Sequence, residues 1–197
     1  IVSAAEGGSS LESAQSGLAK LGSPEDCLPS ESMLNVQAPP RDPDVRSKMQ
    51  EVDKTLADAK LYARKDQAAN VLETTKRGVE LAKAIGYDPL LARALLSHSE
   101  ILGSMERFED ARAVAEDARD AASRGRDNVL LIRSLILLAE HATSNEDRGA
   151  EGLAYVDTAR SIALGTTLPP YFRALLHRRA AIVARATDSA ESSLAEA

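Results

Sequence analysis

The chain has 197 residues, which is enough for one extended domain with a substantial buried core, or for two small domains at most. Hydrophobic residues make up 44% and charged residues 27%, which excludes a disordered tail and a membrane-embedded protein, and the aromatic content of only 3% favours close-packed helices over sheets. The net charge of −6 argues against nucleic acid or an anionic lipid surface as a general partner, because both need a basic face.

The N-terminal part divides into a leader with one short helix (residues 1–21) and a proline-rich loop (residues 22–44). A capping-box pattern at Ser9–Glu12 precedes apolar residues at helical spacing, which predicts a short amphipathic helix. Those apolar residues are Leu11, Ala14, Leu18 and Leu21. Residues 22–44 contain five prolines, which disfavour a helix interior, so we expect a loop. The single cysteine, Cys27, has no partner within the chain for a disulfide or a zinc site.

Residues 45–197 contain an internal repeat. An arginine followed by a short apolar run starts at Arg93 and recurs at Arg133 and Arg173, each time forty positions further along the chain. Each copy follows a glycine that suits a helix C-terminus. These glycines are Gly86, Gly125 and Gly165. The recurrence predicts four helix pairs, at about 45–86, 88–125, 128–165 and 168–197.

The unit at 88–125 resembles the tetratricopeptide repeat. Ser99 takes the small-residue position of the first helix, Phe108 lies in the turn, and Ala111 and Ala118 take small positions of the second helix. The next unit fits less closely because it lacks the aromatic residue in the turn. The resemblance implies an all-α fold, a right-handed stack of antiparallel helix pairs (a tetratricopeptide-like α-solenoid) preceded by the short helix and the proline-rich loop.

The last unit, 168–197, departs from the pattern. Arg178 and Arg179 fall near positions that should be apolar, so this unit is either a polar cap or an incomplete repeat.

A second resemblance covers roughly residues 10–140. Cys27 followed by the run Pro39–Arg46, together with the run Gly78–Ala92, looks like the region after the kinase domain in large bacterial serine/threonine protein kinases of the myxobacterial type. In that family such repeats commonly follow a membrane-spanning helix and act as an extracytoplasmic sensory or docking region, often with paired cysteines near the position of Cys27. The resemblance implies a non-catalytic sensory or protein-interaction module outside the membrane, and a cytoplasmic location is the alternative. Because the chain begins without Met and ends inside a predicted helix, we expect a fragment whose kinase domain, if any, lies upstream.

We expect no catalytic residue, no metal site and no cofactor. His98, His141 and His177 lack the spacing of metal ligands, and the catalytic motifs of kinases are absent from the sequence. No uncharged apolar run approaches the roughly 20 residues of a spanning helix, so we expect no membrane insertion by this chain. The leading function is binding of a protein or peptide whose identity the sequence does not give. A stand-alone adaptor without a kinase and a helical-repeat enzyme are the alternatives.

Two groups of charged residues are candidate binding surfaces. Arg93 and Glu100 are separated by two helical turns and therefore lie on one helix face, and Arg133 and Glu140 repeat them one unit later, with Arg173 as a third member. One hypothesis is that this ladder lines a groove and binds a mixed-charge peptide. The alternative is that arginine and glutamate pair between adjacent units and only keep the surface hydrated.

The second group is a basic helix in an acidic protein, with His177, Arg178, Arg179 and Arg185 after Arg173. Such a helix is usually a solvated face. The alternative is that it docks an acidic partner or another copy of the chain, so self-association is left open.

Overall fold

The computed structural model describes residues 36–63, 68–144 and 148–195, and all regular structure within these ranges is helical. This confirms the predicted all-α class for the described part of the chain. The helices are α3 (Pro43–Ala63), α4 (Ala68–Ile85), α5 (Asp88–Ser104), α6 (Phe108–Arg124), α7 (Asn128–Thr143), α8 (Gly149–Leu164) and α9 (Pro170–Ala195). The predicted helix after Ser9 and most of the predicted proline-rich loop lie outside the described residues.

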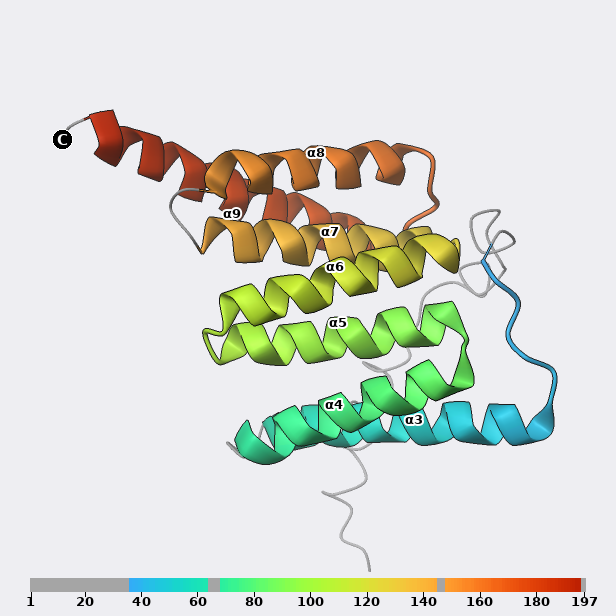
Figure 1. Ribbon diagram of the computed structural model, residues 1–197. Helices are drawn as coiled ribbons and strands as arrows, with labels where there is room; N and C mark the ends of the chain where they lie inside the picture. Colours follow the sequence, from blue (N-terminus) through green and yellow to red (C-terminus); the bar gives the residue numbers. More distant parts are fainter. Residues whose placement is uncertain (1–35, 64–67, 145–147, 196–197) are drawn as a thin grey trace, which may run out of the picture.

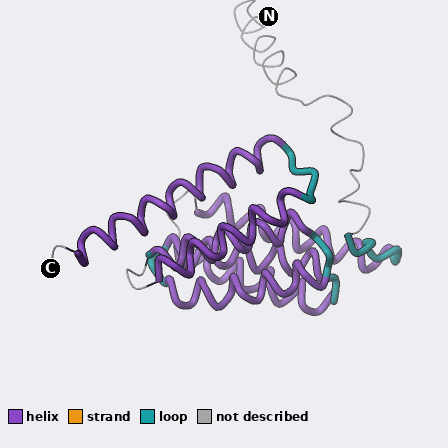
Figure 2. The backbone as a smooth tube through the Cα atoms, turned by 90° about the horizontal axis from the view of Figure 1, so that it is seen from above, coloured by secondary structure: helices purple, strands orange, loops and turns teal. Residues whose placement is uncertain are grey.

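The helices stack in chain order, with α3 and α4 at one end and α8 and α9 at the other (Figure 1). Each helix packs against its neighbours in the chain. In addition α3 contacts α5, α5 contacts α7 and α7 contacts α9, so the odd-numbered helices form a continuous layer. The C-terminal turns of α9 project beyond the other helices, as both views show (Figures 1 and 2).

Helix α6 packs through a face made of alanine. Ala111, Ala115 and Ala118 on this face are 0% exposed, and so are Ala121 and Ala122. These residues fall three and four apart, so they share one side of the helix. Because their side chains are so small, the backbones of α5 and α7 can approach α6 closely, and Ser99 Oγ on α5 donates to the carbonyl oxygen of Ala111 at 2.7 Å.

Two of the recurring glycines are needed at their turns for different reasons. Gly86 has φ +71°, a conformation that side chains disfavour, and it ends α4 as predicted. In the turn after α6 the positive φ of 54° belongs to Arg126 instead. Gly125 is needed for space, because a Cβ there would lie 2.9 Å from the Pro89 side chain.

The chain enters the stack through the end of the predicted proline-rich loop. The backbone N–H of Gln37 donates to the carbonyl oxygen of Gly125 at 2.9 Å, and the Tyr87 hydroxyl donates to the carbonyl oxygen of Gln37 at 2.9 Å. These bonds tie residues 36–42 to the ends of α4 and α6 along one edge of the stack (Figure 1). Helix α3 then begins at Pro43, slightly earlier than predicted, since proline is well suited to a first helical turn.

The segment predicted as a fourth helix pair at 168–197 is a single helix, α9, over its described residues. The stretch after Pro170 contains no further proline and no glycine, so nothing in its backbone chemistry interrupts the helix. The last unit therefore has one helix where each preceding unit has two.

Candidate functional site

Three arginine–carboxylate pairs cross the layer of odd-numbered helices. Arg93 Nη2 on α5 lies 3.2 Å from Asp53 Oδ1 on α3, and Arg133 Nη2 on α7 lies 2.9 Å from Glu100 Oε1 on α5. Arg179 Nε on α9 lies 2.9 Å from Glu140 Oε1 on α7. Each pair joins an odd-numbered helix to the one before it, and we call these three pairs the ion-pair ladder.

The ladder brings together four of the five predicted residues and leaves out Arg173. This guanidinium donates to the carbonyl oxygen of Leu168 at 3.3 Å, and Arg179 takes its place beside Glu140. The two arginines are separated by about 9 Å along the helix axis, as follows from the rise per residue. We expected Arg173 in the third pair of the ladder, and the structure corrects this, because Arg179 lies there instead.

Sequence reasoning missed Asp53, the first carboxylate of the ladder. It lies one repeat length before Arg93, so continuing the repeat backwards by one unit would have found the position. Asp53 has the opposite charge to Arg93, so the recurrence of arginine does not reveal it. The pairs also form between helices, and Arg93 and Glu100 on α5 bind different neighbours.

Arg133 is held on two sides. Besides its bond to Glu100, its guanidinium carbon lies 6.0 Å from the centroid of the half-buried Phe172 ring on α9. A guanidinium at this distance from an aromatic ring is weakly attracted to the ring face. This contact links the third and fourth units on the same surface as the ladder.

Glu140 is the least exposed carboxylate of the ladder, with 24% of its side chain accessible. Burial raises the pKa of Glu140 above its ordinary value, and the nearby Glu100 adds to this, while Arg179 and Arg178 oppose it. The carboxylate thus lies among charges of both signs.

Arg179 belongs to the ion-pair ladder, and the other basic residues of α9 lie outside it. Arg173, His177, Arg178 and Arg185 are exposed, and Arg179 is partly buried in its pair with Glu140. Among the side chains that the structure describes, no carboxylate lies within ion-pair distance of Arg173, Arg178 or Arg185.

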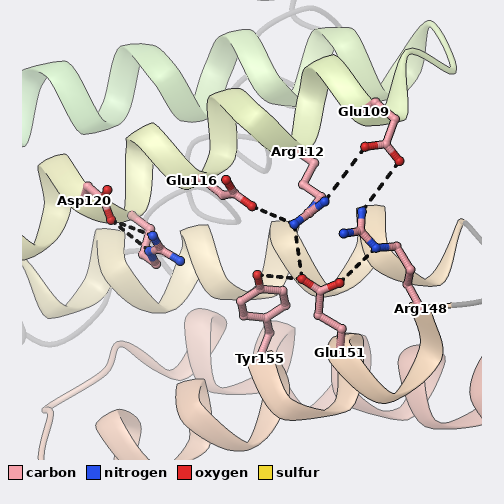
Figure 3. A network of polar contacts seen from close by, with 8 residues as sticks. Glu109, Arg112, Glu116, Asp120, Arg148, Glu151 and Tyr155 are labelled. Carbon is pink, nitrogen blue, oxygen red and sulfur yellow. Dashed lines mark hydrogen bonds and ion pairs between the residues drawn. The ribbon is translucent and has the colours of Figure 1, made fainter.

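A second polar network, not anticipated from the sequence, links α6 and α8 (Figure 3). Arg112 Nη2 lies 3.0 Å from Glu116 and 3.3 Å from Glu151, and Glu151 also binds Arg148 at 3.0 Å and accepts from the Tyr155 hydroxyl at 3.0 Å. Burial raises the pKa of Tyr155, and its hydrogen bond to Glu151 adds to this. The network joins the second helices of adjacent units, and Arg112 Nε is buried within it without a hydrogen-bond partner among the described residues.

Two of the three histidines bridge helices inside the stack. His98 Nδ1 lies 2.8 Å from Thr75 Oγ1, and His141 Nε2 lies 3.1 Å from Ser99 Oγ. Since the Ser99 hydroxyl already donates to Ala111, it accepts from His141. Burial lowers the pKa of both histidines, and nearby Arg107 and Lys76 lower that of His98 further. His177 is exposed on α9.

Within residues 36–63, 68–144 and 148–195 no three His, Cys, Asp or Glu side chains gather as a set of metal ligands. None of the helices in this part of the chain is both long and apolar enough to cross a membrane. No protein-family model matches the chain, and neither the curated proteins nor the solved structures contain a significant match to it.

Proposed function

We propose that this chain is a tetratricopeptide-like repeat module that binds a protein or peptide partner and has no catalytic role of its own. The proposal is supported by the regular recurrence of helix pairs along the chain and by the contacts of each odd-numbered helix with the next one. Such stacks offer an extended surface to a partner without an enclosed active site.

The observation that carries the proposal is the ion-pair ladder. It places guanidinium and carboxylate groups at repeated positions on one partly exposed layer, with side-chain exposures between 24% and 51%. Exposed pairs of this kind contribute only about 0 to 1 kcal/mol to stability, so stability is a weak reason for their recurrence. Recognition of a ligand whose own charged groups pair with the residues of the ladder is a stronger reason for their recurrence.

The ladder also limits the chemistry of the ligand. Every arginine in it already has a carboxylate partner, so a purely anionic ligand would have to displace Asp53, Glu100 or Glu140 and would be repelled by them. A peptide with charges of both signs can pair with both the arginine and the carboxylate of a ladder pair. We therefore propose a mixed-charge peptide with moderate affinity and modest salt dependence.

The cellular setting that we propose is the non-catalytic region of a bacterial serine/threonine kinase. Its support is the resemblance carried by the runs Pro39–Arg46 and Gly78–Ala92. The sequence of the parent polypeptide tests this setting, because a catalytic domain ahead of the chain is expected and a DNA-binding or effector domain would contradict it.

The binding proposal is tested by removing the arginines of two ladder pairs at once. The chain is used to select ligands from a random peptide display library and from a lysate of the source cell, and affinities are then measured with purified ligands. The double substitution Arg93→Ala with Arg133→Ala should weaken binding at least about tenfold, which corresponds to about 1.4 kcal/mol.

A matched control removes two arginines from the second helices. Arg124→Ala with Arg160→Ala changes the net charge equally, and both residues are more than half exposed. Both double variants should melt like the unaltered protein. If the ladder variant folds and binds every selected ligand with unchanged affinity, the ladder is only hydrated surface and the proposal is wrong.

A further inference from the structure

Helix α9 has a side that no described part of the protein covers. The residues on this side fall three, four and seven positions apart, so they form a stripe that runs for about 21 Å along the helix. The exposed members of the stripe are Tyr171, Ala174, Arg178, Ala181, Ile182 and Arg185. We call them the outer α9 face. The opposite side of the helix, with Leu176, Ala180 and Val183, packs against α7 and α8.

The arginines of the outer α9 face differ from those in the rest of the stack. Within helices α4–α8 every arginine has a carboxylate partner. These are Arg77, Arg93, Arg112, Arg119, Arg124, Arg133 and Arg160. In α9 only Arg179 has such a partner among the described side chains, and Glu140, whose charge Arg178 also feels, is already bound by it. Arg178 and Arg185 therefore carry charges that no described carboxylate neutralises at close range.

Exposed apolar side chains lie among these charges. Among the side chains that the structure describes, the exposed large apolar ones are Leu164, Tyr171 and Ile182, and two of the three belong to the outer α9 face. The ring of Tyr171 packs edge to face on that of Phe172 at a centroid distance of 5.6 Å, and Ile182 lies about one turn beyond Arg178. A surface that combines apolar groups with unpaired cations suits a partner that is itself amphipathic.

The other odd-numbered helices indicate what kind of element packs on such a helix. Each of α3, α5 and α7 packs against the helix that follows it in the chain, and no described helix follows α9. Ala174 and Ala181 leave room for a second helix to approach the outer α9 face, as the alanines of α6 do inside the stack. An extended peptide would find no free backbone edge, because the N–H and C=O groups of α9 are bonded within the helix. A helix therefore fits this surface better than a strand.

We propose that the outer α9 face binds an acidic amphipathic helix of a partner protein, about four turns long. Carboxylates of that helix pair with Arg178 and Arg185, and its apolar side chains cover Tyr171 and Ile182. Two copies of α9 packed together would instead bring arginine against arginine. The net charge of −6 disfavours an extended polyanion such as nucleic acid.

The outer α9 face shares no residue with the ion-pair ladder. The pairs of the ladder join one helix to the next through groups that already neutralise each other. The outer α9 face has cations and no carboxylate, so it favours a ligand of one sign where the ladder favours a mixed one. The two surfaces are therefore tested with separate substitutions.

Selection from a display library of amphipathic helical peptides tests the proposal. The library keeps leucine at helical spacing along one side and places glutamate, lysine or glutamine at random on the flanking positions. Peptides selected by the full chain should be enriched in glutamate at those positions. Arg178→Glu with Arg185→Glu should weaken binding of the glutamate-rich peptides at least about tenfold, and Tyr171→Ser with Ile182→Ser at least about threefold.

Two controls accompany these variants, and thermal melts should show that all of them fold. Lys48→Glu with Lys54→Glu makes the same change of charge at exposed residues of α3, at the other end of the stack. The ladder variant Arg93→Ala with Arg133→Ala tests whether the selected peptides bind the ladder instead. Both controls should bind the glutamate-rich peptides with affinities within about twofold of the unaltered protein.

The proposal is overturned if the selected peptides carry no excess of glutamate, or if none of them loses affinity on the α9 substitutions. Binding of the chain to vesicles that contain phosphatidylserine, lost in Arg178→Glu with Arg185→Glu, would assign the face to a lipid surface. A mass in sedimentation that rises with concentration and falls in the same variant would assign it to a second copy. Either result also overturns the proposal, and neither bears on the peptide that we propose for the ladder.

Discussion

At the scale of single residues, His141 is a closely packed polar group of the core. Its side chain is 7% exposed, its ring lies 6.4 Å from the ring of Phe108, and a Cβ added at Gly103 would lie 2.6 Å from its Cε1 atom. Burial lowers its pKa, and among the described side chains no carboxylate lies within ion-pair distance of the ring. A positive charge on this ring would therefore be poorly solvated and unpaired.

We expect acid to destabilise the protein partly through His141. Because the folded-state pKa lies below the ordinary value, the unfolded chain binds the proton more tightly. The contribution to stability is complete above the ordinary pKa of 6.5 and is lost as the pH falls through the lower folded value. His141→Gln should flatten the dependence of Tm on pH between about 7 and 5.

The matched control is His177→Gln, which makes the same substitution at an exposed position of α9, away from the buried contact with Ser99. Glu140 acts in the opposite direction, because burial raises its pKa and its neutral form is favoured on folding. The comparison must therefore be between variants and not between pH values alone. Equal slopes for His141→Gln and the unaltered protein would show that His141 does not titrate during unfolding.

At the scale of the element, α6 is a helix whose packing depends on the absence of large side chains. Its buried face consists of alanines, and most of the residues on its other side are charged. Alanine on the buried face contributes little apolar area of its own. It allows α5 and α7 to bury their larger residues, such as Leu96 and Leu138, close to the α6 backbone.

Ala118→Leu should overpack this contact and lower the free energy of unfolding by about 1 to 3 kcal/mol. Urea unfolding measures the change, and the m value should stay constant. The control is Ala113→Leu on the exposed side of the same helix, which should change the free energy by no more than about 0.5 kcal/mol. If both variants are equally stable, Ala118 does not lie at a close helix contact.

At the scale of the whole molecule, the contacts are almost all between helices that are close in the chain. Helices α3 and α9 are separated by the whole stack, and no substantial contact joins them. In such an arrangement the stability of each part depends on its own unit and on the adjacent one. The two ends should therefore respond separately to a substitution.

Val52→Ala in α3 and Val183→Ala in α9 test this independence, since both side chains are 0% exposed. Val52→Ala should speed hydrogen exchange in α3 and α4 at least about fivefold and leave α8 and α9 nearly unchanged, and Val183→Ala should do the reverse. An equal acceleration in every helix after either change would mean that the molecule opens as a single cooperative unit.

The sequence by itself determined the helical class, the turns at Gly86, before Phe108 and at Gly125, and the alanine face of α6. These features depend on residues within one or two helical turns of each other, and proline, glycine and apolar spacing report such short distances directly. The internal repeat also indicated that Arg93, Arg133, Glu100 and Glu140 share one surface, because equivalent positions of successive units lie on the same side of the stack.

Only the tertiary structure decided which groups meet. Asp53 pairs with Arg93, Arg179 replaces Arg173 beside Glu140, and the last unit has a single helix. The buried contact of His141 and the network around Arg112 also became visible only there. The physical reason is that the offset between two packed helices is set by how their side chains interlock, and a shift of one or two turns changes every partner while the spacing within each helix stays the same.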